Sequence, residues 1–255
     1  MISKTTDLDN ALLEKLKGNH YSRRIKSNFN AYGGNFDFLQ FFKIIKNGKL
    51  YGLASMFNST LIISTFNEIE FDDEIIEEIS VLISMNKPFT IEIEKQYAEK
   101  LALYINNDYN SIIRKEFQYI TKNSIPDIEV NDVPALEDVF NVLKTGFPEI
   151  ASAYPMWLTD TSHRIRHGLA QSFLMGNYST ASIQYIVDRI ALIGHVATIP
   201  EEQGKFHARQ LLFWIGEKLT ADGFDVRLMA RPHRVSYYEE IGFKEIASDI
   251  VFERK

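Results

Sequence analysis

The sequence contains no cysteine, no long apolar run and no excess of basic residues. The lack of cysteine excludes disulfides, thiolate metal sites and a cysteine nucleophile. The formal net charge is −6, and a chain without a basic surface is not expected to bind nucleic acid. No stretch approaches the roughly 18–20 apolar residues of a membrane-spanning helix, and residues 1–10 lack the apolar segment of a signal peptide. We therefore expect a soluble cytoplasmic protein with no nucleic-acid and no membrane partner.

The residues that are present are those of a globular protein. Hydrophobic residues make up 45% of the 255 residues, aromatic residues 13% and charged residues 24%. This composition excludes disordered, collagen-like and coiled-coil chains. The length suits one large domain or two small ones, since domains average roughly 100–150 residues.

Hydrophobic periodicity and turn residues predict the same order of elements in each half of the chain. A proline in a polar turn, Ile125-Pro126-Asp127, marks the boundary between them. The first half is predicted to have helices at 7–17, 21–30, 72–85 and 96–106, and strands at 38–45, 51–57, 60–65, 90–93 and 111–121. The second half is predicted to have helices at 135–145, 155–170, 203–221 and 235–241, and strands at 128–130, 172–175, 182–187, 190–198, 224–229 and 243–252.

One stretch of the second half has the features of an anion site. Residues 196–208 read as a strand end, a turn and a helix start. The first turn of a helix leaves main-chain N–H donors unpaired and carries partial positive charge, so a phosphate or diphosphate is a natural occupant. Gly204 permits close backbone approach and Lys205 adds a cation. An ordinary strand-to-helix connection is the alternative interpretation.

Two motifs together resemble those of the GNAT (GCN5-related N-acetyltransferase) superfamily. The acetyl-CoA motif V-x-V/T-x-P, two residues, Q/R-x-x-G-x-G/A matches 196–208, and the later Y-E-K-L-G-F matches 238–243. The resemblance implies an α+β fold with two tandem GNAT-like domains, each a mixed, mostly antiparallel sheet flanked by helices. Residues 127–255 would be the acetyltransferase domain that binds acetyl-CoA, and 1–126 a degenerate domain without a cofactor site.

The same resemblance implies roles for individual residues. The main chain of the strand end would pair with the pantetheine arm, and the loop amides would hold the diphosphate. Tyr238 would be the general acid that protonates the departing CoA thiolate, because a phenol donates a proton at neutral pH without itself being charged. The implied cofactor-binding residues are Val196, Ala197, Thr198, Gln203, Gly204, Lys205, Phe206, His207 and Ala208.

The sequence departs from the family pattern at two places. Phe206 replaces the first motif glycine, and its side chain would crowd or redirect the cofactor while its N–H stays available. Some family members carry a base carboxylate upstream on the strand, where this chain has residues 191–193, Ala-Leu-Ile. His195 is the nearby candidate for the base, since its ordinary pKa of about 6.5 suits amine deprotonation through water. A packed strand histidine is the alternative.

The helix predicted at 155–170 is amphipathic and is the candidate acceptor surface. At about 100° per residue, Asp160, His163, Arg164 and His167 share one narrow arc. Arg164 suits bidentate pairing with a substrate carboxylate. A solvated face, or a contact with the first half, is the alternative. A metal pair of His163 and His167 lacks a clear third ligand beyond Asp160, so we expect no metal.

The corresponding loop of the first half is unsuited to a phosphate. Residues 66–75 contain no glycine and no basic residue, but several carboxylates, which repel a diphosphate and suit helix capping. We expect this half to support the second half and to wall off part of the acceptor site.

The sequence thus predicts an N-acetyltransferase that uses acetyl-CoA as co-substrate and acts on a small-molecule amine by direct attack in a ternary complex. A homodimer is one assembly that the sequence allows. A non-catalytic acyl-CoA-binding or regulatory protein is the main alternative. Aminoacyl transfer by tandem GNAT-like domains is a further one, against which the acidic charge and the short length count.

Overall fold

The computed structural model describes all 255 residues. They form two compact units, of which the first comprises Met1–Arg114 with Ser248–Lys255 and the second Lys115–Ala247. The mixed α+β content predicted from the sequence is confirmed. The domain boundary between residues 126 and 127 stays a prediction, while the compact units divide between residues 114 and 115.

The first unit contains a mixed sheet. Its strands are β1 (Ile2–Thr5), β2 (Leu39–Lys46), β3 (Lys49–Phe57), β4 (Thr60–Thr65), β5 (Thr90–Glu92), and parts of β6 (Tyr109–Tyr119) and β11 (Phe243–Arg254). They follow the order β1-β2-β3-β4-β5-β11-β6. The β4–β5 pair is parallel, and β5 pairs antiparallel with β11 through Val251 and Glu92. The helices are α1 (Asn10–Leu13), α2 (His20–Tyr32), α3 (Asp73–Asn86) and α4 (Lys95–Ile105).

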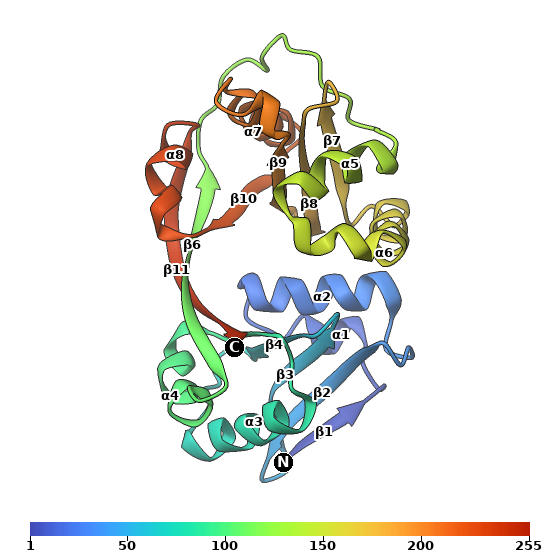
Figure 1. Cartoon of the computed structure of the whole chain (residues 1–255). Coiled ribbons are helices and arrows are strands. Elements are labelled where there is room, and N and C mark those ends of the chain that lie inside the picture. Colours follow the sequence, from blue (N-terminus) through green and yellow to red (C-terminus); the bar gives the residue numbers. More distant parts are fainter. The chain divides into compact units, whose positions relative to one another are not determined.

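Helices cover both faces of this sheet (Figure 1). On one face, Ile25 of α2 packs with Phe41 and Leu53 of the strands. On the other face, α3 and α4 supply apolar residues such as Ile79 and Leu101. Because successive side chains of a strand point to opposite faces, neighbouring strand residues contribute to different clusters.

The second unit repeats the element order of the first half of the chain. Its helices are α5 (Leu136–Gly146), α6 (Tyr154–Arg166), α7 (His207–Ala221) and α8 (Val235–Glu239), with short 3-10 helices at Pro148–Ala153, Pro200–Glu202 and Pro232–Arg234. Its strands β7 (Gln171–Met175), β8 (Ser179–Val187), β9 (Ile190–Thr198) and β10 (Asp225–Ala230) join β6 in the order β6-β10-β9-β8-β7. Only the β9–β10 pair of this series is parallel.

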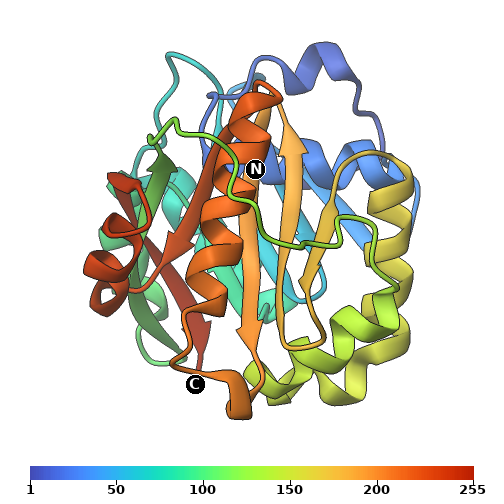
Figure 2. The same cartoon turned by 90° about the horizontal axis from the view of Figure 1, so that it is seen from above.

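Helix α7 covers one face of the second unit's sheet and α5 the other. Leu211, Ile215 and Leu219 of α7 pack with Ala181 and Ile193 of the strands, and Figure 2 shows α7 lying along this sheet. On the opposite face, α5 packs on Leu174 and Ala197. The apolar side of the long helix therefore faces the sheet.

Several predicted elements are wrong in detail. Residues 128–130 form no strand, and an isolated bridge between Asn131 and Leu174 is the only strand-like pairing there. The helix predicted at 155–170 ends at Arg166, because Gly168 adopts a φ of 67°. The helix predicted at 203–221 begins at His207, and that predicted at 7–17 shortens to Asn10–Leu13. Strand β1 was not predicted. None of the helices combines the length and the apolar character needed to span a bilayer.

Candidate functional site

Strands β9 and β10 separate near their ends. Their parallel register runs to the pair Ile193–Leu228 and then stops. Strand β10 continues its pairing with β6 as far as Ala230 and Lys115, and β9 continues its pairing with β8 as far as Thr198 and Ser179. Residues 194–198 therefore have β8 on one side and no paired strand on the other. Such an edge can accept an extended ligand through main-chain hydrogen bonds.

A bulge in β9 lies where the two strands separate. The register with β8 shifts between Thr180 and Ser182, and His195 adopts a left-handed φ of 51°. An extra residue in one strand bends it and increases its twist, which moves β9 away from β10. The His195 side chain is exposed, with its ring edge-on to Phe147 at 5.7 Å. His195 thus lies on the strand with an exposed side chain that contacts Phe147, and its role as the base stays a prediction.

The predicted pantetheine-binding residues lie on this open edge. Val196, Ala197 and Thr198 are the last residues of β9. The Ala197 side chain is buried against α5, where a Cβ on Gly146 would lie 2.9 Å from it. Glycine at the end of α5 therefore permits close packing of this helix on the strand. The side chain of Ala197 serves the core, and its carbonyl faces β8, where it accepts from the Ser179 hydroxyl at 3.3 Å.

The loop after β9 leads to a helix start without a side-chain cap. Phe206 is the N-cap of α7 and makes no side-chain capping bond. The first helical hydrogen bond is donated by Gln210 to the Phe206 carbonyl at 3.0 Å, so the N–H groups of His207, Ala208 and Arg209 meet no acceptor. These donors, with the partial positive charge of the helix end, form a suitable site for a phosphate group.

Phe206 adopts an unusual conformation for a large residue. Its φ is 65°, and that of Gly204 is 79°. The left-handed region favours glycine, and a Phe there stores about 1 kcal/mol or more of strain. The Phe206 side chain is 67% exposed. The backbone thus has the shape expected of the motif glycine, although the residue is Phe.

Lys205 and His207 both contact Glu202. The Lys205 Nζ lies 2.8 Å from Oε1 of Glu202, and the His207 Nε2 lies 3.0 Å from Oε2. Hydrogen bonds from Lys205 and His207 lower the pKa of Glu202, so its carboxylate is ionised at neutral pH. The positive charge that the sequence predicts at Lys205 is therefore balanced by Glu202, which occupies a position where the motif specifies no residue type. The His207 ring also packs against the Tyr178 ring, with the ring centroids 4.3 Å apart and the planes tilted by 42°.

Gln203 joins the loop to the strand end. Its side-chain Nε2 donates to the Thr198 carbonyl at 3.1 Å. This bond fixes the turn between β9 and α7 across the 3-10 helix Pro200–Glu202. The Gln203 side chain thus stabilises the conformation of the loop, and Gly204 and the residues after it form the turn into α7.

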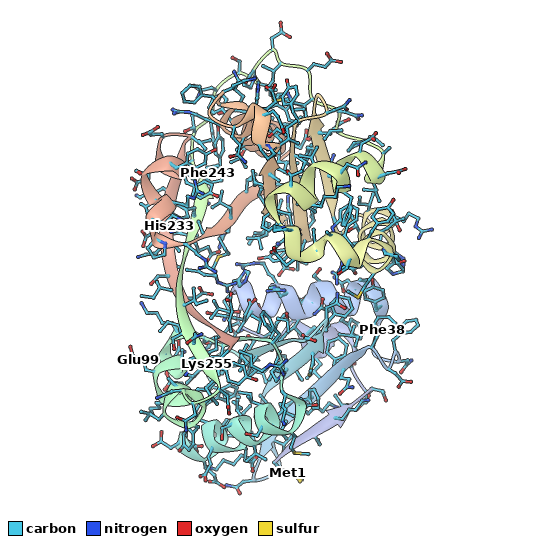
Figure 3. The ribbon with its side chains drawn as sticks, in the orientation of Figure 1. Met1, Phe38, Glu99, His233, Phe243 and Lys255 are labelled. Atoms are coloured by element: carbon cyan, nitrogen blue, oxygen red, sulfur yellow. The ribbon has the colours of Figure 1, made fainter.

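Tyr238 lies on α8 with its ring among other aromatic rings of the second unit. Its ring centroid is 5.5 Å from that of Phe117, 5.2 Å from Tyr237 and 6.1 Å from Phe243. Figure 3 labels Phe243 at the start of β11. Burial raises the pKa of Tyr238 above its ordinary value, so the phenol is protonated at physiological pH. A protonated phenol is the form that a general acid requires.

The four polar residues predicted on one face of this helix form two pairs, an ion pair and a pair of histidine rings. Three of the four lie in α6, and His167 directly follows its last residue. The Arg164 Nε donates to Asp160 Oδ1 at 2.8 Å, one helical turn away. The rings of His163 and His167 lie 4.5 Å apart. His167 caps the C-terminal end of α6 and does not belong to the helix, because Gly168 ends it. The Arg164 guanidinium is therefore paired within its own helix.

The corresponding edge of the first unit is occupied by the chain itself. The β4–β5 ladder stops at Ile62 and Glu92, as β9–β10 stops at Ile193 and Leu228. Beyond that point, the main-chain N–H and the hydroxyl of Thr65 donate to Glu94 Oε1 at 2.9 and 2.6 Å. The Thr65 carbonyl accepts from the Lys17 N–H at 3.2 Å. The edge that is open in β9 is thus closed in β4.

The helix that follows β4 also differs from α7. Asp72 is the N-cap of α3, and its side chain accepts from the Ile75 N–H at 3.1 Å. Asp73 and Glu74 add negative charge in the first turn. Capping by carboxylates satisfies the helix start and repels a phosphate. No group of three or more His, Asp or Glu side chains in either unit is arranged to hold a metal ion.

Comparisons with known proteins give similarities of structure only. No family model matches the sequence, and no curated protein matches it. A GNAT-family acetyltransferase from Colwellia psychrerythraea matches with a TM-score of 0.58 and 13% identity, over 100% of this chain and 99% of that one. A putative acetyltransferase from Pyrococcus horikoshii matches with a TM-score of 0.64 and 13% identity, over 99% and 88%.

Two further structures support the same fold. A GCN5-related N-acetyltransferase from Sphaerobacter thermophilus matches with a TM-score of 0.63 and 13% identity, over 92% of this chain and 85% of that one. A tandem GNAT protein from the clavulanic acid biosynthesis pathway matches with a TM-score of 0.59 and 9% identity, over 84% and 82%. The resemblance that the two motifs indicated is confirmed at the level of the fold: this chain has the fold of the GNAT acetyltransferases.

Proposed function

We propose that the protein is an acetyl-CoA-dependent N-acetyltransferase that acts on a small amine. One observation carries the proposal: the open edge of β9 at residues 194–198 leads directly into the uncapped start of α7. An extended arm that pairs with the strand edge and ends in a diphosphate at the helix start matches the chemistry of coenzyme A. The fold neighbours support an acetyltransferase over other users of that cofactor.

In the proposed complex, the main chain of Val196, Ala197 and Thr198 pairs with the amides of the pantetheine arm. The N–H groups of residues 204–208 hold the diphosphate oxygens, and Gly204 keeps the loop clear of side chains on its surface. Lys205 and His207 act as a unit with Glu202, so the charge they present to the diphosphate is smaller than two free cations would give.

The proposed reaction is direct transfer in a ternary complex. The lone pair of the neutral amine attacks the thioester carbonyl, which forms the C–N bond and a tetrahedral oxyanion. Collapse of that intermediate breaks the C–S bond, and Tyr238 gives its proton to the departing thiolate. His195 takes the excess proton of the nitrogen through water, which leaves an N-acetyl product and free coenzyme A.

We assign the acceptor side to the face of α6 that carries Asp160, His163, Arg164 and His167. Since Arg164 is already paired with Asp160, a substrate carboxylate would have to compete with that aspartate for the guanidinium. An amine acceptor would likewise have to compete with Arg164 for the Asp160 carboxylate. Either kind of acceptor would therefore bind this face by exchange with the Asp160–Arg164 ion pair.

We propose that residues 1–126 are a degenerate repeat of the same domain and bind no acetyl-CoA. The closed edge at Thr65 and the acidic cap at Asp72 support this. Cytoplasmic location and assembly as a homodimer stay predictions.

The experiment that tests the function is an acetylation assay with a panel of small amines, read by release of free thiol from acetyl-CoA. We expect turnover of at least one primary amine and none without an acceptor beyond slow hydrolysis. Tight acetyl-CoA binding with no acetylated amine would favour the second candidate, a non-catalytic acyl-CoA-binding protein. The strained, exposed Phe206 in place of the motif glycine is the observation that favours that candidate.

A further inference from the structure

The helix that carries Tyr238 is held by few contacts. Helix α8 has five residues, Val235–Glu239, and none of them is buried. Tyr237 and Tyr238 rest half-buried against the core of the second unit. A single helical turn with one apolar side is not stable by itself, since a helix this short gains little from its own hydrogen bonds. The position of its C-terminal end depends on what binds it there.

Arg209 binds that end with both arms of its guanidinium. Its Nη1 donates to Glu240 Oε2 at 2.8 Å, and its Nη2 donates to the main-chain carbonyl of Glu240 at 3.0 Å. Glu240 is the C-cap of α8. The last carbonyls of a helix have no partner within the helix, so the second bond satisfies one of them. The planar fork of arginine presents its donors to two acceptors in a fixed geometry, which the compact ammonium of lysine lacks.

Arg209 also belongs to the first turn of α7, beside the amides that the proposed function assigns to the diphosphate. The Arg209 side chain therefore joins the start of α7 to the end of α8, although Arg209 and Glu240 are 31 residues apart in the sequence. Tyr238 lies two residues before Glu240 on the same short helix, so the position of the phenol is coupled to that of Glu240.

We propose that Arg209 is a positioning residue for Tyr238: through its fork on Glu240, it fixes the phenol relative to the start of α7. This inference rests on the proposed function, in which the α7 start holds the cofactor and Tyr238 protonates its sulfur. Proton transfer needs donor and acceptor within about 3 Å, and a displacement of about 1 Å can cost up to about a hundredfold in rate.

The contact is well suited to mutation because it is partly exposed. The side chain of Arg209 is 37% exposed and that of Glu240 is 61% exposed. Exposed ion pairs contribute little to stability, so variants of Arg209 are expected to fold. A loss of activity in them would then come from the position of α8 and not from unfolding.

The test is a double-mutant cycle of Arg209→Met and Tyr238→Phe, with Arg209→Lys as the conservative variant and Glu239→Gln as a control without a contact to Arg209. We expect Arg209→Met to lower kcat about tenfold, Arg209→Lys to restore only part of it, and Glu239→Gln to leave it unchanged. In the Tyr238→Phe background, Arg209→Met should have no further effect on kcat. Equal losses in both backgrounds, or a rise confined to the KM for acetyl-CoA, would overturn the proposal.

A second readout needs no catalysis. With tyrosine labelled in the ring, NMR assigns the Tyr238 signal by its loss in Tyr238→Phe. We expect Arg209→Met to shift that signal and to bring the pKa of the phenol closer to its ordinary value, because α8 becomes more exposed. An unchanged signal would overturn the positioning role even if no amine were ever acetylated. Failure of acetyl-CoA to bind the wild-type protein would instead overturn the proposed function.

Discussion

The ring of Tyr238 lies 5.5 Å from the ring of Phe117, a fully buried residue of β6. The phenol that we assign as the general acid is thus seated on the core of its own unit, while its neighbour Tyr237 lies on the same short helix. The two adjacent tyrosines have similar half-buried surroundings, and burial raises the pKa of each. They therefore form a matched pair for testing the acid.

Tyr238→Phe removes the proton donor and keeps the packing. We expect kcat to fall about a hundredfold, at the low end of what a general acid contributes, while the Kd for acetyl-CoA stays within a factor of two. Tyr237→Phe should leave both values near those of the wild type. Equal kcat values for wild type and Tyr238→Phe would remove Tyr238 from the chemistry. Since burial raises the pKa of Tyr238 above the ordinary value of a phenol, kcat should not fall through loss of this proton on going from neutral to mildly alkaline pH.

Glu202→Gln should tighten the binding of acetyl-CoA several-fold. The substitution removes a negative charge beside the proposed diphosphate site and releases Lys205 and His207 from their pairs. The gain should shrink in high salt, because exposed charges are screened. Glu201→Gln, which changes the neighbouring exposed carboxylate, is the control. Weaker binding by Glu202→Gln would mean that Glu202 orders the loop and does not oppose the anion.

Phe206→Gly should stabilise the fold slightly without loss of acetyl-CoA binding. Glycine removes the strain of the left-handed φ of 65°, although its greater freedom in the unfolded chain offsets part of the gain, so we expect up to about 1 kcal/mol. Phe206→Ala removes the ring and keeps the strain, and should not stabilise. Thermal unfolding and calorimetry measure the two effects. Loss of binding in both variants would give the Phe206 ring a direct role in holding the ligand.

Glu92 should make stability of the first unit sensitive to acid. It is buried, which opposes ionisation, yet ion pairs with Arg114 and Arg24 hold its pKa well below the ordinary 4.5. The folded state therefore binds the proton less readily than the unfolded state. The stabilisation is complete above pH 4.5 and is lost as the pH falls below that value.

The variant Glu92→Gln leaves the half-buried Arg24 and Arg114 without their buried carboxylate partner and should cost about 3 kcal/mol at pH 7. The difference from wild type should narrow on going from pH 7 to pH 4, as measured by urea unfolding. Glu99→Gln, at an exposed position of α4, should change stability little at either pH. A difference that stays constant with pH would show that Glu92 is not the titrating group.

The sequence predicted the fold well where periodicity and turn residues agree. The strands predicted at 38–45 and 51–57 pair as β2 and β3, and the long helix predicted at 203–221 is present as α7. Helix ends were less predictable, because they depend on local backbone geometry. The start of α7 shifts to His207 because Gly204 and Phe206 take left-handed φ values. A Phe residue does not favour that conformation, so the sequence could not predict it at position 206.

The features of the candidate site that the sequence did not predict are contacts between residues of different elements. Glu202 follows the proline of the motif, yet its pairing with Lys205 and His207 depends on the loop folding back. The bond of Arg209 to Glu240 and that of Thr65 to Glu94 join different elements. No spacing rule within one helix or strand predicts such pairs, whereas Asp160 and Arg164, one helical turn apart, were correctly placed on one face.

The central claim is that β9 and the start of α7 form the chain's one binding site for acetyl-CoA, and calorimetry with acetyl-CoA tests it most directly. We predict saturable binding with one molecule per chain, with a Kd in the micromolar range. No binding at high micromolar concentration, or two equivalent molecules per chain, would contradict the account.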